Sequence, residues 1–190
     1  MEIKKMDRRV KYTKMVIKES FVKILKQKPI SKISIKEICD DADINRATFY
    51  AHYLDQYDLL QQIENEIVAD INQYLSNYDF QNSNDVPVDA IEKIMEYIME
   101  NSELFDLLLN SNGDMQFQQE ITNIIGQQHF SSMIQNNFLS KENAEYIFHF
   151  LASGSVGIIQ KWLKDGMKKS PKEMAELILR LAINGRSSFE

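Results

Sequence analysis

The sequence of 190 residues has few of the residues that interrupt helices or cross-link a chain. It contains three prolines, six glycines and a single cysteine, Cys39. One cysteine excludes an internal disulfide, so a reducing cytoplasm is the expected location. No apolar run approaches the roughly 20 residues that span a bilayer, and the basic N-terminus lacks the apolar stretch of a signal peptide. We therefore expect a cytoplasmic protein with no membrane partner.

Charge is distributed unevenly along the chain. The formal net charge of −6 argues at first against a nucleic-acid partner. Residues 1–60, however, hold 13 Lys and Arg against 9 Asp and Glu, whereas residues 61–190 hold 9 against 19. This division is typical of a small basic head on an acidic body, and a basic head suits a polyanion. A solvated basic helix without a partner gives the same counts.

Apolar residues recur at helical spacing almost throughout, and no segment alternates as a strand does. The spacing predicts an opening helix from about Lys11 to Lys28 and a longer helix marked by the apolar residues from Leu60 to Ile71. The polar stretch 78–85 is the clearest break. Further helical stripes follow at residues 91–99, 117–125, 144–162 and 174–182. The predicted fold class is therefore all-α.

Two short helices, separated by about three residues, follow the opening helix. Ser34 and Glu37 have the spacing of a capping box, which begins the first of them. Asn45 is a suitable cap for the second, which runs from Arg46 to His52. This arrangement is typical of a helix-turn-helix, whose second helix lies in the major groove of DNA. An ordinary helical hairpin with a polar face has the same spacing.

The second short helix has one apolar side and one projecting side. Phe49 faces inward, toward the apolar residues of the preceding helix and turn. The projecting side chains suit DNA: arginine pairs with guanine, threonine meets a thymine methyl group or a phosphate, and tyrosine suits a phosphate oxygen. These projecting residues are Arg46, Thr48, Tyr50 and His52.

The segment from Ile33 to Leu60, ISIKEICDDADINRATFYAHYLDQYDLL, resembles the signature of the tetracycline-repressor-like (TetR) family. The shared features are the apolar core of the two short helices, the run from Thr48 to Tyr50, the pair His52-Tyr53 and the closing leucines. The resemblance implies a homodimeric and usually repressing regulator of nine or ten helices. It also implies a pseudo-palindromic operator of double-stranded DNA and an inducer pocket in the body.

The resemblance also assigns roles to individual residues. Thr13 and Ser34 are expected to anchor the DNA backbone, and the second short helix is expected to read the bases. The full set expected at or near DNA is Thr13, Ser34, Lys36, Asn45, Arg46, Ala47, Thr48, Tyr50, His52 and Gln56.

Two positions depart from the family pattern. Asp43 stands in the turn where the family often has glycine, and Asp is among the residues that tolerate such a turn. Gln56 stands where the family favours a lysine that supports phosphate binding. The missing contact is then expected from Lys32, Lys36 or the basic cluster at residues 4–11, acting as a flexible arm along a groove. A solvated tail is the alternative for that cluster.

The body is expected to form a dimer. Its seam at residues 144–163 and its last helix would make a two-helix face, and two copies would give a four-helix interface around a two-fold axis. The alternative is that these residues complete the core of one chain. The expected interface residues are Phe148, Leu151, Ser155, Ile159, Ile178 and Leu181.

Nine methionines and ten phenylalanines suggest an adaptable apolar interior in which an effector could bind. The candidate pocket residues are Met95, Ile98, Phe105, Leu108, Phe117, Ile121, Phe150 and Trp162. Each of them also fits an ordinary core position. No convergent polar set indicates the chemistry of the effector, which stays unknown.

Other chemistry has little support in the sequence. The three histidines lack metal-ligand spacing, and no phosphate-binding glycine loop or nucleophile motif occurs. We therefore expect no enzyme, no metal and no cofactor. The combined prediction is an all-α chain of about nine helices, with a three-helix DNA-binding head at residues 1–56 and a helical effector-binding and dimerisation body at residues 57–190. The alternative function is a helical adaptor or an activator whose body binds a protein partner.

Overall fold

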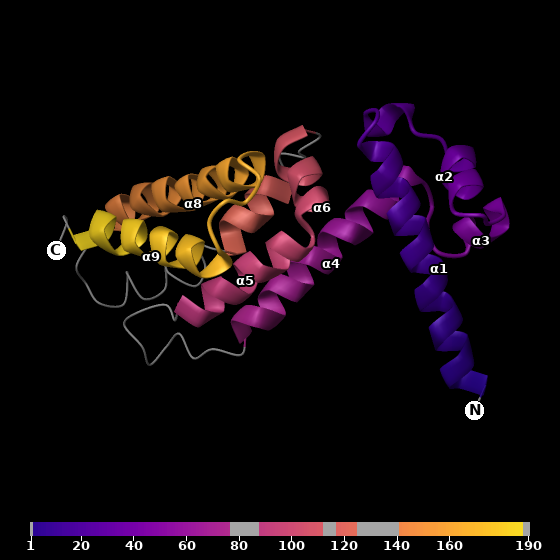
Figure 1. The fold of residues 1–190 in the computed structure, drawn as a ribbon, viewed down its shortest axis with the longest axis horizontal. Coiled ribbons are helices and arrows are strands. Elements are labelled where there is room, and N and C mark those ends of the chain that lie inside the picture. The colour runs from indigo at the N-terminus through magenta and orange to yellow at the C-terminus, as the bar shows by residue number, and fades with distance from the viewer. Residues whose placement is uncertain (1, 77–87, 112–116, 125–140, 188–190) are drawn as a thin grey trace. The chain divides into compact units, whose positions relative to one another are not determined.

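The computed structural model describes residues 2–76, 88–111, 117–124 and 141–187. Every regular element in these ranges is helical (Figure 1), which confirms the all-α fold class. Among the described helices, none combines the length and the apolar character that crossing a bilayer requires. The polar break expected at residues 78–85 lies outside the described residues.

The chain divides into two compact units, Met1–Ile67 and Val68–Glu190. The division falls inside helix α4 (Gln56–Ser76) and not after residue 56, where the sequence suggested it. The first part of α4 belongs to the first unit, because Leu59 and Ile63 are buried and Glu66 Oε2 lies 3.4 Å from Lys18 Nζ.

The first unit, hereafter the head, is built on three further helices and a short turn. These are α1 (Glu2–Leu25), the 3-10 turn η1 (Ile30–Lys32), α2 (Ile35–Asp41) and α3 (Arg46–Tyr50). Helix α1 packs against α2, and α2 packs against α3. Their apolar sides form one core, in which Phe21, Ile38 and Phe49 are 0 % exposed.

Helix α1 begins earlier than its apolar pattern predicted. Its residues extend back to Glu2, so the basic segment 4–11 is helical. The helix contradicts the flexible arm and the disordered tail considered for this segment. Residues 8–11 are exposed, and contact of this helix with DNA stays a prediction. The segment contains no proline or glycine and is rich in lysine and arginine, which favour a helix even where no apolar stripe is present.

The second unit, hereafter the body, contains five described α-helical segments and one π-helical turn besides the end of α4. The α-helical segments are α5 (Val88–Glu100), α6 (Ser102–Asp106), a helical segment at residues 117–124, α8 (Lys141–Lys164) and α9 (Pro171–Ser187). Helix α5 packs along α9, and α8 contacts both α6 and α9. Helices α8 and α9 form an antiparallel pair in Figure 1.

A π-helical turn, η2 (Leu107–Ser111), follows α6 directly and brings three elements of the body together. The Leu109 carbonyl accepts hydrogen bonds from two glutamine side chains, Gln118 Nε2 at 3.0 Å and Gln160 Nε2 at 2.7 Å. These glutamines come from the 117–124 segment and from α8. The two bonds satisfy the Leu109 carbonyl and join η2 to both neighbouring segments.

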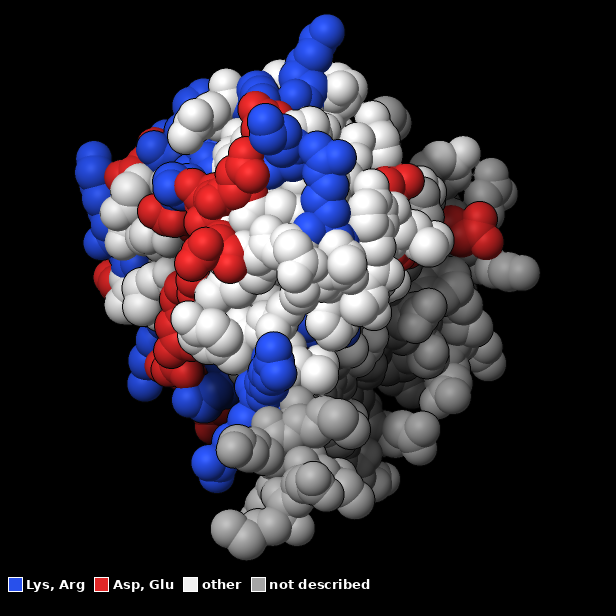
Figure 2. All heavy atoms as spheres, turned by 90° about the vertical axis from the view of Figure 1, so that its right-hand side faces the viewer, with Lys and Arg blue, Asp and Glu red and all other residues white. Residues whose placement is uncertain are grey.

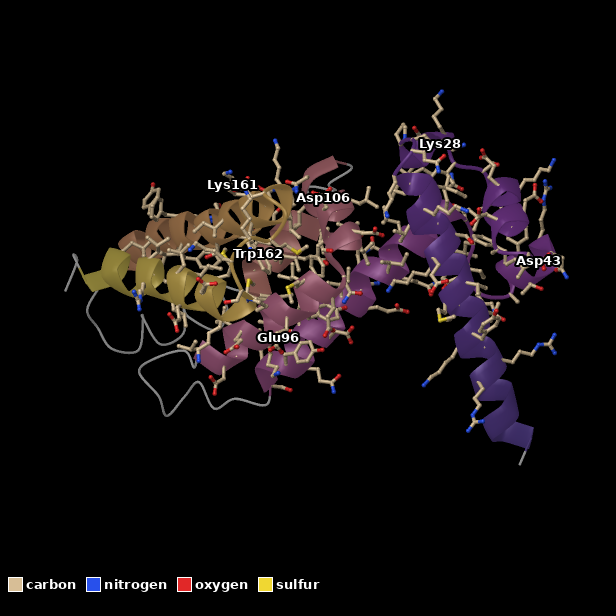
Figure 3. The ribbon with its side chains drawn as sticks, viewed as in Figure 1. Lys28, Asp43, Glu96, Asp106, Lys161 and Trp162 are labelled. Atoms are coloured by element: carbon tan, nitrogen blue, oxygen red, sulfur yellow. The ribbon has the colours of Figure 1, made fainter. Side chains whose placement is uncertain are left out.

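Helices α8 and α9 are joined by a short turn that contains Gly166. Gly166 and Met167 adopt positive φ angles of 75° and 53°, and Trp162 Nε1 donates to the Lys169 carbonyl at 2.9 Å. Ser170 and Glu173 form a capping box at the start of α9: the Ser170 amide donates to Glu173 Oε2 at 2.7 Å, and the Glu173 amide donates to Ser170 Oγ at 3.2 Å. Figure 3 labels Trp162 within this part of the body.

Candidate nucleic-acid interface

The turn between α2 and α3 sets the direction of α3. The Ile44 amide donates to the Cys39 carbonyl at 3.0 Å, and Asp43 adopts a left-handed φ of 51°. A left-handed residue is the geometry for which glycine is usually required, and Asp is among the few other residues that tolerate it. Asp43, labelled in Figure 3, therefore occupies the strained position that its departure from the family pattern predicted.

Helix α3 has only five residues, so its position depends on its cap and on its one buried side chain. Asn45 Oδ1 accepts from the Thr48 amide at 2.8 Å and from Thr48 Oγ1 at 3.1 Å. Phe49 is fully buried, with its ring 5.7 Å from that of Tyr50 and 5.6 Å from that of Tyr53. The cap and the anchor together hold α3 against the head.

Burial of Phe49 leaves the opposite side of α3 in solvent. Arg46, Ala47 and Tyr50 are exposed, whereas Thr48 and His52 are partly exposed. Asn45 and Thr48 bond to each other, so their oxygens already serve the backbone of α3. Arg46 and Tyr50 are therefore the exposed side chains of α3 that remain available for a contact with DNA.

Helix α2 begins with the capping box that the sequence predicted. Ser34 Oγ accepts from the Glu37 amide at 3.3 Å, and the Ser34 amide donates to Glu37 Oε2 at 3.0 Å. Lys28 bonds to the other Glu37 oxygen. The Lys28 ammonium, followed by the Ser34 hydroxyl and amide, holds the pKa of Glu37 at about 2, below its usual 4.5. The start of α2 is thus fixed by charge as well as by caps.

Cations of the head differ in how far they are already paired. Lys23 Nζ lies 2.5 Å from Asp41 Oδ1, which lowers the pKa of Asp41, and Lys28 bonds to Glu37. Lys32, Lys36 and Arg46 are exposed. In Figure 2, Lys and Arg side chains on the face that is drawn lie among acidic and uncharged ones.

Helix α1 contacts the buried Tyr53 through Lys14, the residue after Thr13. Thr13 is partly exposed, and Lys14 Nζ lies 5.8 Å from the centre of the Tyr53 ring. Burial, with smaller effects of Glu66 and Asp58, raises the pKa of Tyr53 to about 12, so its hydroxyl stays protonated. Tyr53 therefore acts as a neutral support beneath α1.

Two exposed residues of the head were missed in the sequence. Leu54 is 80 % exposed and Tyr57 is 51 % exposed, and both lie where α3 turns into α4. Gln56, which the sequence placed at DNA, is the first residue of α4 and is only partly exposed. Leu54 directly follows the buried Tyr53, and Tyr57 lies in the first turn of α4, where no apolar spacing in the sequence marks the exposed side.

In the body, seven of the eight candidate pocket residues line the interior and one does not. Met95, Ile98, Phe105, Leu108, Phe117, Ile121 and Trp162 are at most 7 % exposed. Phe150 is 75 % exposed, so its assignment to the interior is wrong for the single chain. It lies on the exposed side of α8, whose buried residues are Ala152, Ser155, Val156, Ile159, Trp162 and Leu163.

The expected dimer residues also divide between the two sides of α8 and α9. Ser155, Ile159 and Ile178 are at most 9 % exposed, and Ser155 Oγ donates to the Leu151 carbonyl at 2.8 Å, so these residues complete the core of one chain. Phe148 and Leu151 are partly exposed, and Leu181 is 52 % exposed. The large exposed apolar residues of this pair are Tyr146, Phe150, Leu177 and Leu181.

The described residues contain no group of three or more His, Cys, Asp or Glu side chains that could hold a metal ion. Cys39 is buried in α2, and this burial raises the pKa of its thiol. The short helix α3 carries one cation, Arg46, and exposed hydrogen-bonding side chains, whereas the body carries exposed apolar side chains on α8 and α9.

More than half of the chain matches a known family. Residues 85–184 match the model TetR_C_8, described as "Transcriptional regulator C-terminal region". The HTH-type transcriptional regulator YxbF of Bacillus subtilis (strain 168) is 21% identical over 174 residues, which cover 90% of this chain and 44% of that protein. The chain thus spans less than half the length of this relative.

Solved structures show the same fold. A TetR-family transcriptional regulator from Syntrophomonas wolfei superposes with a TM-score of 0.68 at 17% identity, over 90% of this chain and 93% of that chain. The dihydroxyacetone kinase operon activator DhaS superposes with a TM-score of 0.61 at 18% identity, over 94% of this chain and 98% of that chain. At these identities the likeness establishes the all-α architecture.

Proposed function

The chain belongs to the TetR family of transcriptional regulators, and on that premise we propose that it binds a pseudo-palindromic DNA operator as a homodimer. Each head places α3 in a major groove. An effector in the body changes the spacing of the heads and releases the operator. The family is one of regulators and not of enzymes, in line with the expectation from the sequence. The protein acts on DNA in the cytoplasm.

The exposure pattern of α3 is the observation that carries the proposal. A five-residue helix is unstable alone, yet α3 is capped by Asn45 and anchored by the fully buried Phe49. The outward side chains are Arg46, which can bond to both acceptors of a guanine, and Tyr50, which can donate to a phosphate. A rigid short helix with such a face suits base reading better than it suits packing.

Binding to DNA from upstream of the chain's own gene tests the proposal. Fluorescence anisotropy at two salt concentrations should show tighter binding to this duplex than to a mixed-sequence duplex, and weaker binding at the higher salt, because cation–phosphate contacts release counterions. Arg46→Ala should lower the preference for the upstream duplex, while Tyr50→Phe should weaken binding to both duplexes alike. Equal affinity for both duplexes in the wild type would contradict sequence-specific regulation.

Homodimerisation is supported by the outer side of α8 and α9. Tyr146 and Phe150 are more than two-thirds exposed, and Gly154 and Gly157 continue the same side of α8 at helical spacing. A Cβ atom built at either glycine meets no atom within 4 Å. The single chain therefore has no need of these glycines, whereas a closely packed partner helix does.

Substitution of Gly157 distinguishes a monomeric chain from a dimer that packs closely along α8. In a single chain Gly157→Ala should stabilise α8, by up to about 1 kcal/mol, because alanine is the better helix former. In a close dimer the added methyl group should instead weaken association, which sedimentation measures directly. A wild-type chain that stays monomeric at micromolar concentration would contradict the dimer.

Repression is the sign of regulation that we propose, with effector release as its control. A second candidate is activation, which is favoured by the likeness to DhaS, described as an operon activator. A reporter gene placed behind the bound upstream DNA distinguishes the two. Deleting the chain raises expression if it represses and lowers expression if it activates.

A further inference from the structure

The turn between α8 and α9 carries a dense group of positive charges in the acidic part of the chain. Residues 61–190 hold 9 Lys and Arg against 19 Asp and Glu, and five of these nine cations fall within twelve consecutive residues. All five side chains are exposed. They are Lys161, Lys164, Lys168, Lys169 and Lys172, and we call them the lysine turn.

The backbone beneath these side chains is fixed by hydrogen bonds. The Met167 amide donates to the Trp162 carbonyl at 2.9 Å. The Gly166 amide donates to the Leu163 carbonyl at 3.0 Å, so α8 ends in a Schellman motif. The Trp162 ring, which is only 4 % exposed, donates from Nε1 to the Lys169 carbonyl. The lysine turn is therefore a preformed surface that is anchored on a buried ring.

A carboxylate of the chain itself is already bound by this surface. Lys161 Nζ donates to Asp165 Oδ2 at 2.6 Å. This hydrogen bond lowers the pKa of Asp165, and the charges of Lys168 and Lys164 add to the effect. Three lysines of the turn therefore act on one carboxylate, which makes a carboxylate the anion that their arrangement suits.

Stabilisation of the two helices accounts for only two of the five lysines. Lys161 and Lys164 lie in the last turn of α8, where a cation is favourable at the negative end of the helix dipole. Lys168 and Lys169 precede the start of α9, and Lys172 lies in its first turn, where the dipole is positive and a cation is unfavourable. The three are exposed, so their charges are available to a partner outside the chain.

We infer that the lysine turn is a docking surface for an acidic protein segment, one that presents several Asp or Glu carboxylates. This surface goes beyond the proposed function, in which DNA meets α3 and a second copy meets the apolar residues of α8 and α9. Lysine binds a carboxylate as a point charge, without the planar fork that arginine offers to phosphates and bases. The fixed backbone of the turn sets the spacing of these point charges.

The composition of the turn favours a protein over a nucleic acid or a membrane. Residues 161–173, all of which the structure describes, contain no Arg, Asn or Gln for base edges, and their one aromatic ring, Trp162, is buried. No large apolar side chain in this range is exposed, so none can enter a lipid layer. Asp165 and Glu173 stand among the lysines, where they repel the closely spaced phosphates of DNA. A protein segment can space its carboxylates around them.

Anisotropy with the full-length chain and a fluorescent polyglutamate peptide tests this surface. The triple variant Lys168→Gln/Lys169→Gln/Lys172→Gln should bind the peptide about tenfold more weakly than the wild type, because each exposed charge pair contributes roughly a two- to threefold gain. Binding by the wild type should also weaken as salt is added.

A second triple variant, at exposed lysines of the head, is the matched control, since it removes the same charge from another surface. Its substitutions are Lys11→Gln, Lys32→Gln and Lys36→Gln. This control should keep most of the affinity for the peptide. The unfolding midpoints of both triple variants should equal that of the wild type, because every substituted side chain is exposed.

Asp165→Asn is the second arm of the test. In the wild type the Asp165 carboxylate competes with the partner for Lys161. Its removal should therefore tighten binding of the peptide about two- to threefold at low salt. Glu100→Gln removes the same charge at an exposed site of α5 and should leave the affinity unchanged. Equal tightening by the two substitutions would show a general effect of net charge and would overturn the inference.

Two further probes distinguish the classes of partner. The lysine-turn variant should bind the upstream duplex as tightly as the wild type does, and the wild type should not bind phosphatidylserine vesicles. Loss of duplex binding in this variant would assign the turn to DNA, and vesicle binding that this variant loses would assign it to a membrane. Either result overturns the inference, as does equal affinity of the two triple variants for the peptide, or no binding of the peptide by the wild type. The peptide assay does not depend on DNA binding, so failure of the proposed function leaves this test intact.

Discussion

The head exposes polar side chains on a short helix whose backbone is held by its own cap, whereas the body exposes large apolar side chains on two long helices. On the head, Arg46 and Tyr50 project around the buried Phe49. On the body, Phe150 and Leu181 project from α8 and α9, whose inner sides are already buried. Both surfaces are exposed sides of helices, but the first is polar and the second is apolar.

The two regions therefore differ in whether a second chain is needed to complete their packing. Helix α3 is complete within the head, since its cap and anchor need nothing from outside, and its face suits a hydrated polyanion. The outer side of α8 and α9 is incomplete within one chain, because contiguous apolar surface in water is unfavourable and marks an interaction site. The proposed function therefore combines a preformed reading surface with a pairing surface that a second copy covers.

Removing the anchor of the head should have the largest effect. Phe49→Ala leaves a cavity beneath α3 and should cost about 3–5 kcal/mol of head stability, because the side chain is fully buried. DNA binding should be lost while the helical signal of the body persists, as circular dichroism and anisotropy measure. Tyr50→Ala, at an exposed neighbour, should lose affinity without unfolding. Equal stability of the two variants would contradict the anchor role.

Charging the apolar side of the body should have the next largest effect. Phe150→Asp places a carboxylate at the centre of the proposed pairing surface and should convert the dimer to a monomer in sedimentation. Its unfolding midpoint at low concentration should change little, because Phe150 is 75 % exposed. A dimer that persists in Phe150→Asp would place the interface elsewhere.

Relieving the turn of the head should have a smaller effect of the opposite sign. Asp43 has a φ of 51°, a conformation that costs an ordinary residue roughly 1 kcal/mol and costs glycine almost nothing. Asp43→Gly should therefore raise the free energy of unfolding by up to about 1 kcal/mol. Asp40→Gly, within α2, should not stabilise the head, and Asp43→Val should destabilise it. Stabilisation by both glycines would contradict the argument from φ.

The charge at the start of α2 should have the smallest effect, and it should depend on pH. Because the folded pKa of Glu37 is about 2 and the usual value is 4.5, its contribution to stability is present above pH 4.5 and is lost as the pH falls toward 2. Glu37→Gln should unfold at a slightly lower temperature than the wild type at pH 7, and the difference should shrink between pH 4.5 and pH 2. A difference that stays constant over this range would contradict the Lys28 pairing.

Local rules predicted the head from sequence because they involve neighbouring residues. The capping box of Ser34 and Glu37, the Asn45 cap and the strained Asp43 each depend on a few adjacent positions, and the structure contains all three. The N-terminal extension of α1 was missed because charged residues with high helix propensity carry no apolar stripe.

The sequence did not predict the body in the same detail as the head. Helix α8 carries apolar residues on both sides, so its spacing shows a helix without showing which side faces the core. Ile159 and Phe150 are equally apolar, and only the packed structure separates the buried residue from the exposed one. Tyr57 was missed for a related reason, since the exposed side of the first turn of α4 depends on how that helix packs.

Selection of duplexes from a random pool by the full-length protein tests the central claim most directly. The account predicts an enriched sequence with two-fold symmetry, half-sites spaced by about 10 base pairs or a multiple of it, and two chains bound per duplex. Arg46→Ala should select a pool with weaker preference at one position in each half-site. A pool with no enriched sequence, or a single half-site bound by one chain, would contradict the account.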